Sequence, residues 1–148
     1  MEKLPIRTAS FVFLCILLSS LLTPLYAAER ESCVICGMYL DLYARTRYVI
    51  SFEDGSTQST CSLACAAEII NKNKQRLRDT KVANYLTGEL LDARKAVYLE
   101  GSDVPGVMSY TSRLAFASRD EALSFKKKHG GRIVSFDDAI RNQLMDKQ

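Results

Sequence analysis

The chain has 148 residues, of which 20 are Lys or Arg and 17 are Asp or Glu, so its formal net charge is +3. This length suits one modest domain or two very small ones, and the small charge excess argues against a nucleic-acid-binding protein with a basic face. Its hydrophobic fraction of 47% and charged fraction of 25% are typical of a folded protein. The chain also contains five Cys, a single His and no Trp. Because it has only one His, a site built from several histidines is excluded, and we expect any chemical site to depend on sulfur.

The first 28 residues have the three parts of a secretory signal peptide. Lys3 and Arg7 precede an apolar run over residues 11–22, and Ala27-Ala28 stand before a polar segment. The apolar run is shorter than the roughly 20 residues that a membrane-spanning helix needs. We therefore expect cleavage and export to the periplasm, which leaves residues 29–148 as the mature domain. An uncleaved signal that anchors the protein in the membrane is the alternative.

In chain order, the first predicted elements are a β-hairpin and a helix. We expect strands at Tyr48–Phe52 and Thr57–Thr60, because Asp54-Gly55 between them favours a tight turn. A helix is predicted to begin at about Ser62. The polar and basic stretch Asn71–Lys81 is predicted to be a solvated helix end and loop.

The second part of the chain repeats this mixture of short strands and helices. Two Gly and a Pro make Gly101–Gly106 a loop. A capping box at Ser118–Glu121 opens a helix that His129-Gly130-Gly131 ends, and a short helix follows near Asp137. The remaining strands are predicted at Val82–Leu86, Ala96–Leu99, Ser112–Ala117 and Arg132–Phe136. Helices among short, hairpin-linked strands indicate an α+β fold, with a loose internal repeat of a Gly–Met element, strand, helix and strand.

The cysteines of the expected mature chain come in two pairs, Cys33-x-x-Cys36 and Cys61-x-x-x-Cys65, while Cys15 lies in the apolar leader. Two thiolates separated by two residues converge on one ion from a tight loop. Residues four apart share one face of a helix start, where the helix dipole favours the thiolate form. Two such pairs together indicate a metal site.

Two other interpretations of the cysteines stay open. In an exported protein the four could form two disulfides, although such a low Cys density is not typical of a disulfide-stapled scaffold. Cys33 and Cys36 could also form a redox-active dithiol, although no thioredoxin-like βαβ pattern surrounds them. This second alternative makes the protein a thiol–disulfide exchange protein.

The methionines bear on the choice of metal. Four cysteines alone suit structural Zn(II), which would make the domain an interaction module. Met38 directly follows Cys36-Gly37, and Met108 lies in the Gly-rich loop. Thioether is a good ligand for Cu(I) and a poor one for Zn(II), so these two residues favour Cu(I). The candidate metal ligands are Cys33, Cys36, Met38, Cys61, Cys65 and Met108.

Two further points concern the site. His129 is an additional candidate ligand, but its place before Gly130-Gly131 favours an interaction with the helix end. No nucleophile–base pair is visible, so the sequence predicts no catalytic residue and no enzymatic activity.

Four motifs resemble the NosL family, which comprises exported accessory proteins of nitrous oxide reductase maturation. In chain order they are Cys33-x-x-Cys36-Gly37-Met38, Leu91-Asp92-Ala93-Arg94-Lys95-Ala96, Gly101-Ser102-Asp103-Val104 leading to Gly106-x-Met108, and His129-Gly130-Gly131. The resemblance covers roughly Cys33 to Ile140. It implies two small ββαβ-like halves with metal-binding loops, at about residues 33–100 and 101–148.

The resemblance also implies a Cu(I)-binding metallochaperone that delivers copper to an acceptor enzyme outside the cytoplasm, either nitrous oxide reductase or another exported copper enzyme. The family's C-x-x-C-G-M motif and its second-half Met correspond to Cys33, Cys36, Met38 and Met108. Three features depart from the family. No lipobox Cys marks the cleavage point, Gly106-Val107-Met108-Ser109 stands where Gly-Pro-Met-Gly is usual, and the Cys61/Cys65 pair is an addition.

Overall fold

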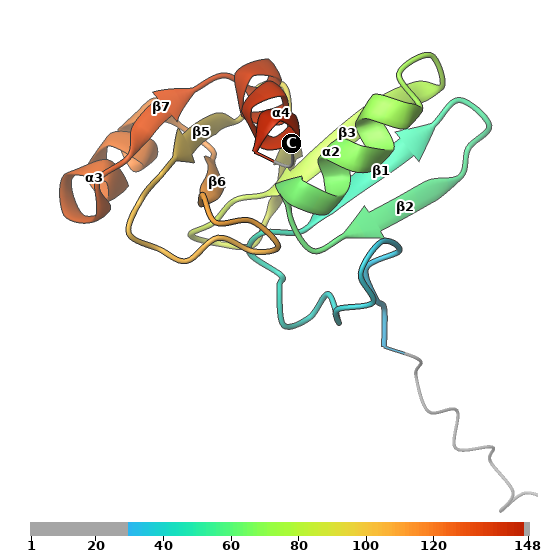
Figure 1. The fold of residues 1–148 in the computed structure, drawn as a ribbon, viewed down its shortest axis with the longest axis horizontal. Coiled ribbons are helices and arrows are strands. Elements are labelled where there is room, and N and C mark those ends of the chain that lie inside the picture. The colour runs from blue at the N-terminus through green and yellow to red at the C-terminus, as the bar shows by residue number, and fades with distance from the viewer. Residues whose placement is uncertain (1–29, 147–148) are drawn as a thin grey trace, which may run out of the picture.

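The computed structural model describes residues 30–146 (Figure 1). The predicted signal peptide and Cys15 lie outside the described residues. In chain order the elements are β1 (Tyr48–Phe52), β2 (Thr57–Thr60), α2 (Leu63–Lys72), β3 (Leu77–Ala83), β4 (Leu90–Asp92), β5 (Val97–Glu100), β6 (Arg113–Phe116), α3 (Arg119–His129), β7 (Arg132–Val134) and α4 (Phe136–Met145). Within residues 30–146, no helix is long and apolar enough to cross a membrane.

Two antiparallel sheets repeat one topology. The first has the strand order β2-β1-β3-β4 and the second has the order β6-β5-β7. In each sheet the first strand of a ββαβ unit lies at the centre, flanked by the second and third strands of that unit. The predicted α+β fold of two ββαβ-like halves is therefore confirmed. The second sheet takes its central strand from Val97–Glu100, so this unit begins slightly before the expected boundary near residue 100.

The first hairpin forms as its turn residues predict. Tyr48 pairs with Thr60 at one end and Ser51 with Thr57 at the other. Gly55 has φ +83°, a left-handed conformation that glycine adopts without a Cβ clash. The Asp54 carboxylate accepts a hydrogen bond of 3.0 Å from the backbone N–H of Ser56. These local contacts fix the direction in which β2 leads toward α2.

The polar stretch after α2 was predicted wrongly. Residues from Leu77 onward form β3, because the free edge of β1 pairs with them and Ile50 stands opposite Thr80. Most side chains of β3 before Val82 remain at least partly exposed, so the strand leaves no apolar signal in the sequence. The predicted strand at Val82–Leu86 was also misplaced, since β3 ends at Ala83.

The misplacement has a local cause at Asn84. Its side-chain oxygen accepts a hydrogen bond from the Leu86 N–H, and its carbonyl accepts one from the Gly88 N–H. This turn sends the chain back to form β4, a strand that the sequence did not predict, in which Leu91 stands opposite Val82.

One apolar core joins the two sheets. Tyr48 and Ile50 of β1, Ile69 of α2, Tyr98 of β5 and Phe136 of α4 belong to a single buried cluster. The rings of Tyr98 and Phe136 lie 5.6 Å apart between centroids. Helix α4 packs beside α2 in the middle of the molecule, and α3 covers the outer part of the second sheet (Figure 1). The loop that carries Cys33 and Cys36 lies at the end of β2, outside both sheets (Figure 1).

Helix α3 begins as the capping box predicts. The Ser118 side chain accepts a hydrogen bond of 3.2 Å from the Glu121 N–H, and the Glu121 carboxylate accepts one of 3.0 Å from the Ala117 N–H. Ala122 and Phe125 of this helix face a second apolar cluster with Leu99. The helix therefore stabilises the outer half of the molecule, away from the cysteine-bearing loop.

Candidate metal centre

Backbone hydrogen bonds shape the first cysteine pair into a tight loop. The Cys33 N–H donates to the Met38 carbonyl, and the Gly37 N–H donates to the Cys33 carbonyl, both at 2.8 Å. Gly37 closes the loop with φ +75°. The Val34 N–H donates to the Ser59 carbonyl at 3.2 Å, which attaches the loop to β2. The first pair is thus held next to the strand that leads to the second pair.

The second pair lies where β2 passes into α2. Cys61 directly follows β2, and Cys65 lies in the first turn of α2. The Thr46 hydroxyl donates a hydrogen bond of 2.7 Å to the Cys61 carbonyl, which fixes the backbone at this junction. Ser62 occupies the N-cap position in an extended conformation. The four-residue spacing therefore brings both sulfurs to the N-terminal end of the helix.

The fold brings all four cysteine sulfurs together, within 4.8 Å of one another. The Cys36 and Cys61 sulfurs are 3.5 Å apart, and those of Cys61 and Cys65 are 3.8 Å apart. Thiolates bound tetrahedrally at about 2.3 Å from one ion would lie about 3.8 Å from each other. The sulfur spacing fits a single metal ion of that size.

Burial distinguishes one cysteine from the others. Cys33, Cys61 and Cys65 are at most 2% exposed, whereas Cys36 is partly exposed. Leu40 is also buried in this cluster, and Tyr43 packs against it. A metal ion held by these sulfurs would be shielded from water except on the side of Cys36.

The sulfurs also set each other's protonation. The hydrogen bond between the Cys65 and Cys61 sulfurs, helped by Cys36 and the neighbouring hydroxyl of Ser62, lowers the pKa of Cys61 to about 5 despite its burial. The same hydrogen bond raises the pKa of Cys65. Burial raises the pKa of Cys36. The cluster therefore favours the thiolate form at Cys61 and disfavours it at Cys36 and Cys65.

The two predicted methionines lie in different surroundings. Met38 is partly buried and packs against the cysteine cluster. Met108 is 48% exposed and lines a pocket with Tyr110 and Gln143, while its neighbour Val107 contacts the cysteine cluster. The structure thus places the Met38 side chain beside the sulfurs and leaves the Met108 side chain about half exposed, one residue away from a cluster contact.

The Met108 loop is folded tightly. Met108 has φ +56°, which is uncommon for a residue with a side chain. A Cβ on Gly106 would lie 2.2 Å from the Ser109 carbonyl oxygen, so only glycine fits there. The loop therefore has a defined shape that fixes the backbone of Met108.

His129 lies elsewhere, at the end of α3. Its ring stacks on Phe125 with a centroid distance of 4.2 Å, and its Nδ1 lies 2.8 Å from an Asp103 carboxylate oxygen. Among the described residues, the group of side chains placed to hold a metal contains the four cysteines and does not include His129. Figure 1 shows α3 at the opposite end of the molecule from β2.

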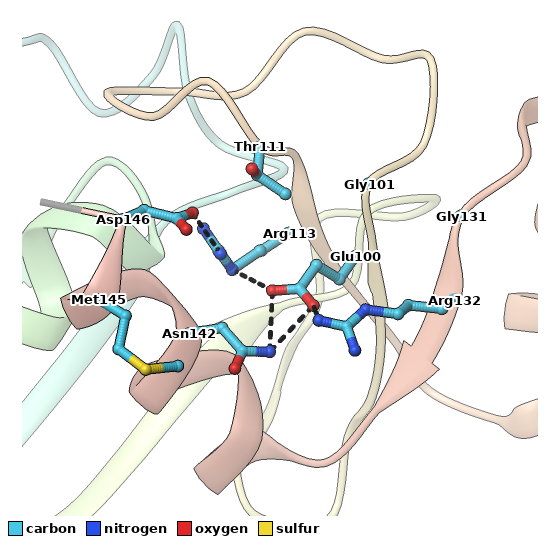
Figure 2. A pocket seen from close by; sticks show the side chains of 9 residues that line it. All are labelled: Glu100, Gly101, Thr111, Arg113, Gly131, Arg132, Asn142, Met145 and Asp146. Carbon is cyan, nitrogen blue, oxygen red and sulfur yellow. Dashed lines mark hydrogen bonds and ion pairs between the residues drawn. The ribbon is translucent and has the colours of Figure 1, made fainter.

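A buried charged network was missed by sequence reasoning (Figure 2). Arg113 at the start of β6 donates from Nε to Glu100 at 2.7 Å and from Nη2 to Asp146 at 2.6 Å. Glu100 also pairs with Arg132 at 2.5 Å and accepts hydrogen bonds from Asn142. Both Glu100 and Arg113 are buried, and both line a cavity of about 520 Å³. The sequence signal for this network is a charged residue at one end of each of two apolar strands, Glu100 in β5 and Arg113 in β6.

This network connects α4 to the Met108 loop. Arg113 donates from Nη1 to Gln143 of α4 at 2.6 Å and to the Ser109 hydroxyl at 3.3 Å. The loop that carries Met108 is therefore attached to the second sheet and to α4 through one guanidinium group.

Comparison with known proteins agrees with this architecture. The NosL family profile matches residues 24–144. The copper-binding lipoprotein NosL of Stutzerimonas stutzeri is 24% identical over 135 residues, which cover 84% of this chain and 70% of that protein. The crystal structure of the copper chaperone NosL from Shewanella denitrificans has the same fold, with a TM-score of 0.62 and 18% identity, over 73% of this chain and 88% of that one. Because the profile spans most of its length, the chain belongs to the NosL family.

Proposed function

We propose that this protein is an exported copper chaperone, which binds Cu(I) as cargo and delivers it to an acceptor enzyme outside the cytoplasm. The meeting of four cysteine sulfurs within 4.8 Å carries the proposal. Thiolate and thioether ligands favour Cu(I) over harder metals. The names of the two relatives, a copper-binding lipoprotein and a copper chaperone, support copper as the metal.

The proposed ligands are the four cysteines with Met38 and Met108. Cys33, Cys36, Cys61 and Cys65 offer more thiolates than the two or three soft ligands with which Cu(I) is satisfied. Met38 packs against them, and Met108, which is about half exposed, follows Val107, a residue that contacts the cluster. A subset of these sulfurs binds the ion at any one time. The remaining sulfurs can replace a bound sulfur while the ion is being transferred.

The partial exposure of Cys36 supports a cargo role for the metal. A structural ion is enclosed by all its ligands, whereas a transferred ion must be reached by an acceptor. Three of the sulfurs are buried, and Cys36 lies in a loop outside the sheets. An acceptor can therefore replace Cys36 first and draw the ion from the remaining sulfurs.

The proposed acceptor is nitrous oxide reductase or another exported copper enzyme. The family resemblance supports this choice, and the lipoprotein name of the Stutzerimonas stutzeri relative supports export. A metal-delivery role requires no catalytic reaction by the protein itself, so no catalytic residue is assigned.

A structural Zn(II) site is the second candidate function. The observation that favours it is the spacing of Cys36, Cys61 and Cys65, which is close to that of tetrahedral thiolates around one Zn(II). In that case the metal would hold the loop of Cys33 and Cys36 against α2, and its removal would unfold this part of the protein.

Anaerobic titration of the reduced protein separates the two candidates. Cu(I) is added in competition with the chelator bathocuproine disulfonate, and Zn(II) in a parallel series. We expect a defined Cu(I) stoichiometry that is lost in the double variant Cys33→Ser/Cys36→Ser. Unchanged Cu(I) binding in that variant would overturn the proposal.

Two further measurements complete the test. Removal of metal with a chelator should leave the far-ultraviolet circular dichroism unchanged for a cargo site, and should reduce it for a structural Zn(II) site. Delivery is tested by mixing the copper-loaded protein with copper-free nitrous oxide reductase and measuring the copper content of each protein after separation. Retention of all copper by the chaperone would remove this enzyme as the acceptor.

A further inference from the structure

We propose that Cys36 and Cys61 form a reversible disulfide when the site holds no metal, so that oxidation prevents metal binding until the disulfide is reduced. The effect of this disulfide on copper loading rests on the proposed copper function. The pairing itself concerns only the chain's own thiols, and it can be tested on the metal-free protein.

Distance selects this pair. The Cys36 and Cys61 sulfurs are 3.5 Å apart, closer than the 3.8 Å between Cys61 and Cys65. A disulfide bond is about 2.05 Å long, so a movement of about 1.5 Å joins them.

Exposure selects the same pair. A disulfide donor must reach one sulfur from solvent, and Cys36 is the member of the cluster that is partly exposed. Cys61 and Cys65 are both buried, so neither sulfur can be the first to attack a donor disulfide in solvent. The contacts Cys33 N–H to Met38 carbonyl and Gly37 N–H to Cys33 carbonyl already fix the shape of the loop. A Cys33–Cys36 bond would lie within this one loop and would not join it to Cys61, so peptide mapping distinguishes the two pairings.

The reaction is two thiol–disulfide exchanges. The Cys36 thiol first loses its proton to water, and the thiolate then attacks one sulfur of a donor disulfide, which gives a mixed disulfide and releases the first donor sulfur, which takes up a proton. The Cys61 thiolate then attacks the Cys36 sulfur and releases the second donor thiol. In total the two protein thiols lose two electrons and two protons, and the donor disulfide is reduced to two thiols.

Oxidation of this pair would remove metal binding. A disulfide sulfur is no longer a thiolate ligand, so Cys33 and Cys65 alone would remain, both buried behind the new bond. Conversely, a bound Cu(I) would occupy both sulfurs and protect them. In an oxidising compartment the protein would therefore need reduction before it is loaded.

The test uses oxidised glutathione as the disulfide donor and the full chain, reduced and freed of metal under anaerobic conditions. After the reaction, remaining thiols are blocked by alkylation and the protein is digested with trypsin. Trypsin separates Glu31–Arg45, which carries Cys33 and Cys36, from Tyr48–Lys72, which carries Cys61 and Cys65. We expect these two peptides to be joined, with fragmentation locating the bond at Cys36 and Cys61 and alkylation at the other two cysteines.

The variants Cys36→Ser and Cys65→Ser form a matched pair. Cys36→Ser should abolish the joined peptides, whereas Cys65→Ser should leave them. Loading with one equivalent of Cu(I) should slow the reaction of the unchanged protein at least tenfold. Separate peptides with internal disulfides, or equal rates with and without bound Cu(I), would overturn the inference. A protein that takes up no Cu(I) at all would instead refute the proposed function, and the peptide result would still decide the pairing.

Discussion

The sulfur of Cys36 lies 3.5 Å from the sulfur of Cys61, although the residues are 25 apart in the chain. The contact exists because the Val34 N–H donates to the Ser59 carbonyl, which places the cysteine loop against β2 just before Cys61. The four-sulfur cluster is therefore a product of the folded first unit. Neither cysteine pair alone would present more than two sulfurs to a metal.

Cys61 is the residue whose loss should weaken Cu(I) binding most, because its sulfur is within 3.8 Å of both Cys36 and Cys65. We expect Cys61→Ser to lower Cu(I) affinity by about 100-fold, a loss of about 2.7 kcal/mol in binding free energy. Chelator competition measures the effect. Ser62→Ala is the matched control, since it keeps every thiol and removes only the hydroxyl that contacts Cys61. Equal effects of the two changes would contradict the assignment of Cys61 as a ligand.

The metal-free protein should contain a thiolate at unusually low pH. The hydrogen bond from Cys65 lowers the pKa of Cys61 from the ordinary value of 9.0 to about 5, so the thiolate forms as the pH rises through about 5. Thiolate absorbance near 240 nm should therefore show a first step there. In Cys61→Ser that step should be absent. A titration with no step below neutral pH would show that the sulfurs do not stabilise a shared thiolate.

Part of this structure could be predicted from sequence because its signals are local. The hairpin between Tyr48 and Thr60 follows from its turn residues, and α3 follows from the capping box at Ser118. Strand β3 could not be predicted, because its polar residues pair with an edge that only the folded β1 supplies. The spacing of the cysteines indicated a metal site, whereas their arrangement depends on a backbone contact between Val34 and Ser59 that no spacing indicates.

Two exposed methionines allow a matched test of thioether ligation. Met108 is 48% exposed and Met145 is 56% exposed, and leucine has a similar volume to methionine. If Met108 takes part in holding the cargo, Met108→Leu should weaken Cu(I) binding by about tenfold, or about 1.4 kcal/mol, and leave Zn(II) binding unchanged. Met145→Leu should change neither. Equal affinities for Cu(I) in both variants would remove Met108 from the ligand set.

Gly106 should be required for the shape of the Met108 loop. In Gly106→Ala the new Cβ would lie 2.2 Å from the Ser109 carbonyl oxygen and 2.9 Å from that of Thr111. We expect a loss of about 1–3 kcal/mol in the free energy of unfolding, measured in urea. Gly101→Ala is less suitable as a control because φ +73° strains any side chain there. Pro105→Ala, next to the same position, should have a smaller effect.

The buried charge of Arg113 should contribute more to stability than a surface ion pair of the same kind. Its side chain and that of Glu100 are each 3% exposed, so Arg113→Met would leave a buried carboxylate with Arg132 and Asn142 as its remaining partners. Removing one partner of such a pair reduces the free energy of unfolding by about 3–5 kcal/mol.

Arg94 provides the control for this change. It pairs with Asp137 at 3.4 Å, and both side chains are at least 70% exposed, so Arg94→Met should lower stability by less than about 1 kcal/mol. Urea unfolding of the reduced proteins compares the two. The double variant Arg113→Met/Glu100→Gln should recover part of the loss, because the amide carries no charge to be left buried. Similar stabilities of the Arg113→Met and Arg94→Met proteins would show that the network in Figure 2 does not hold α4 to the second sheet.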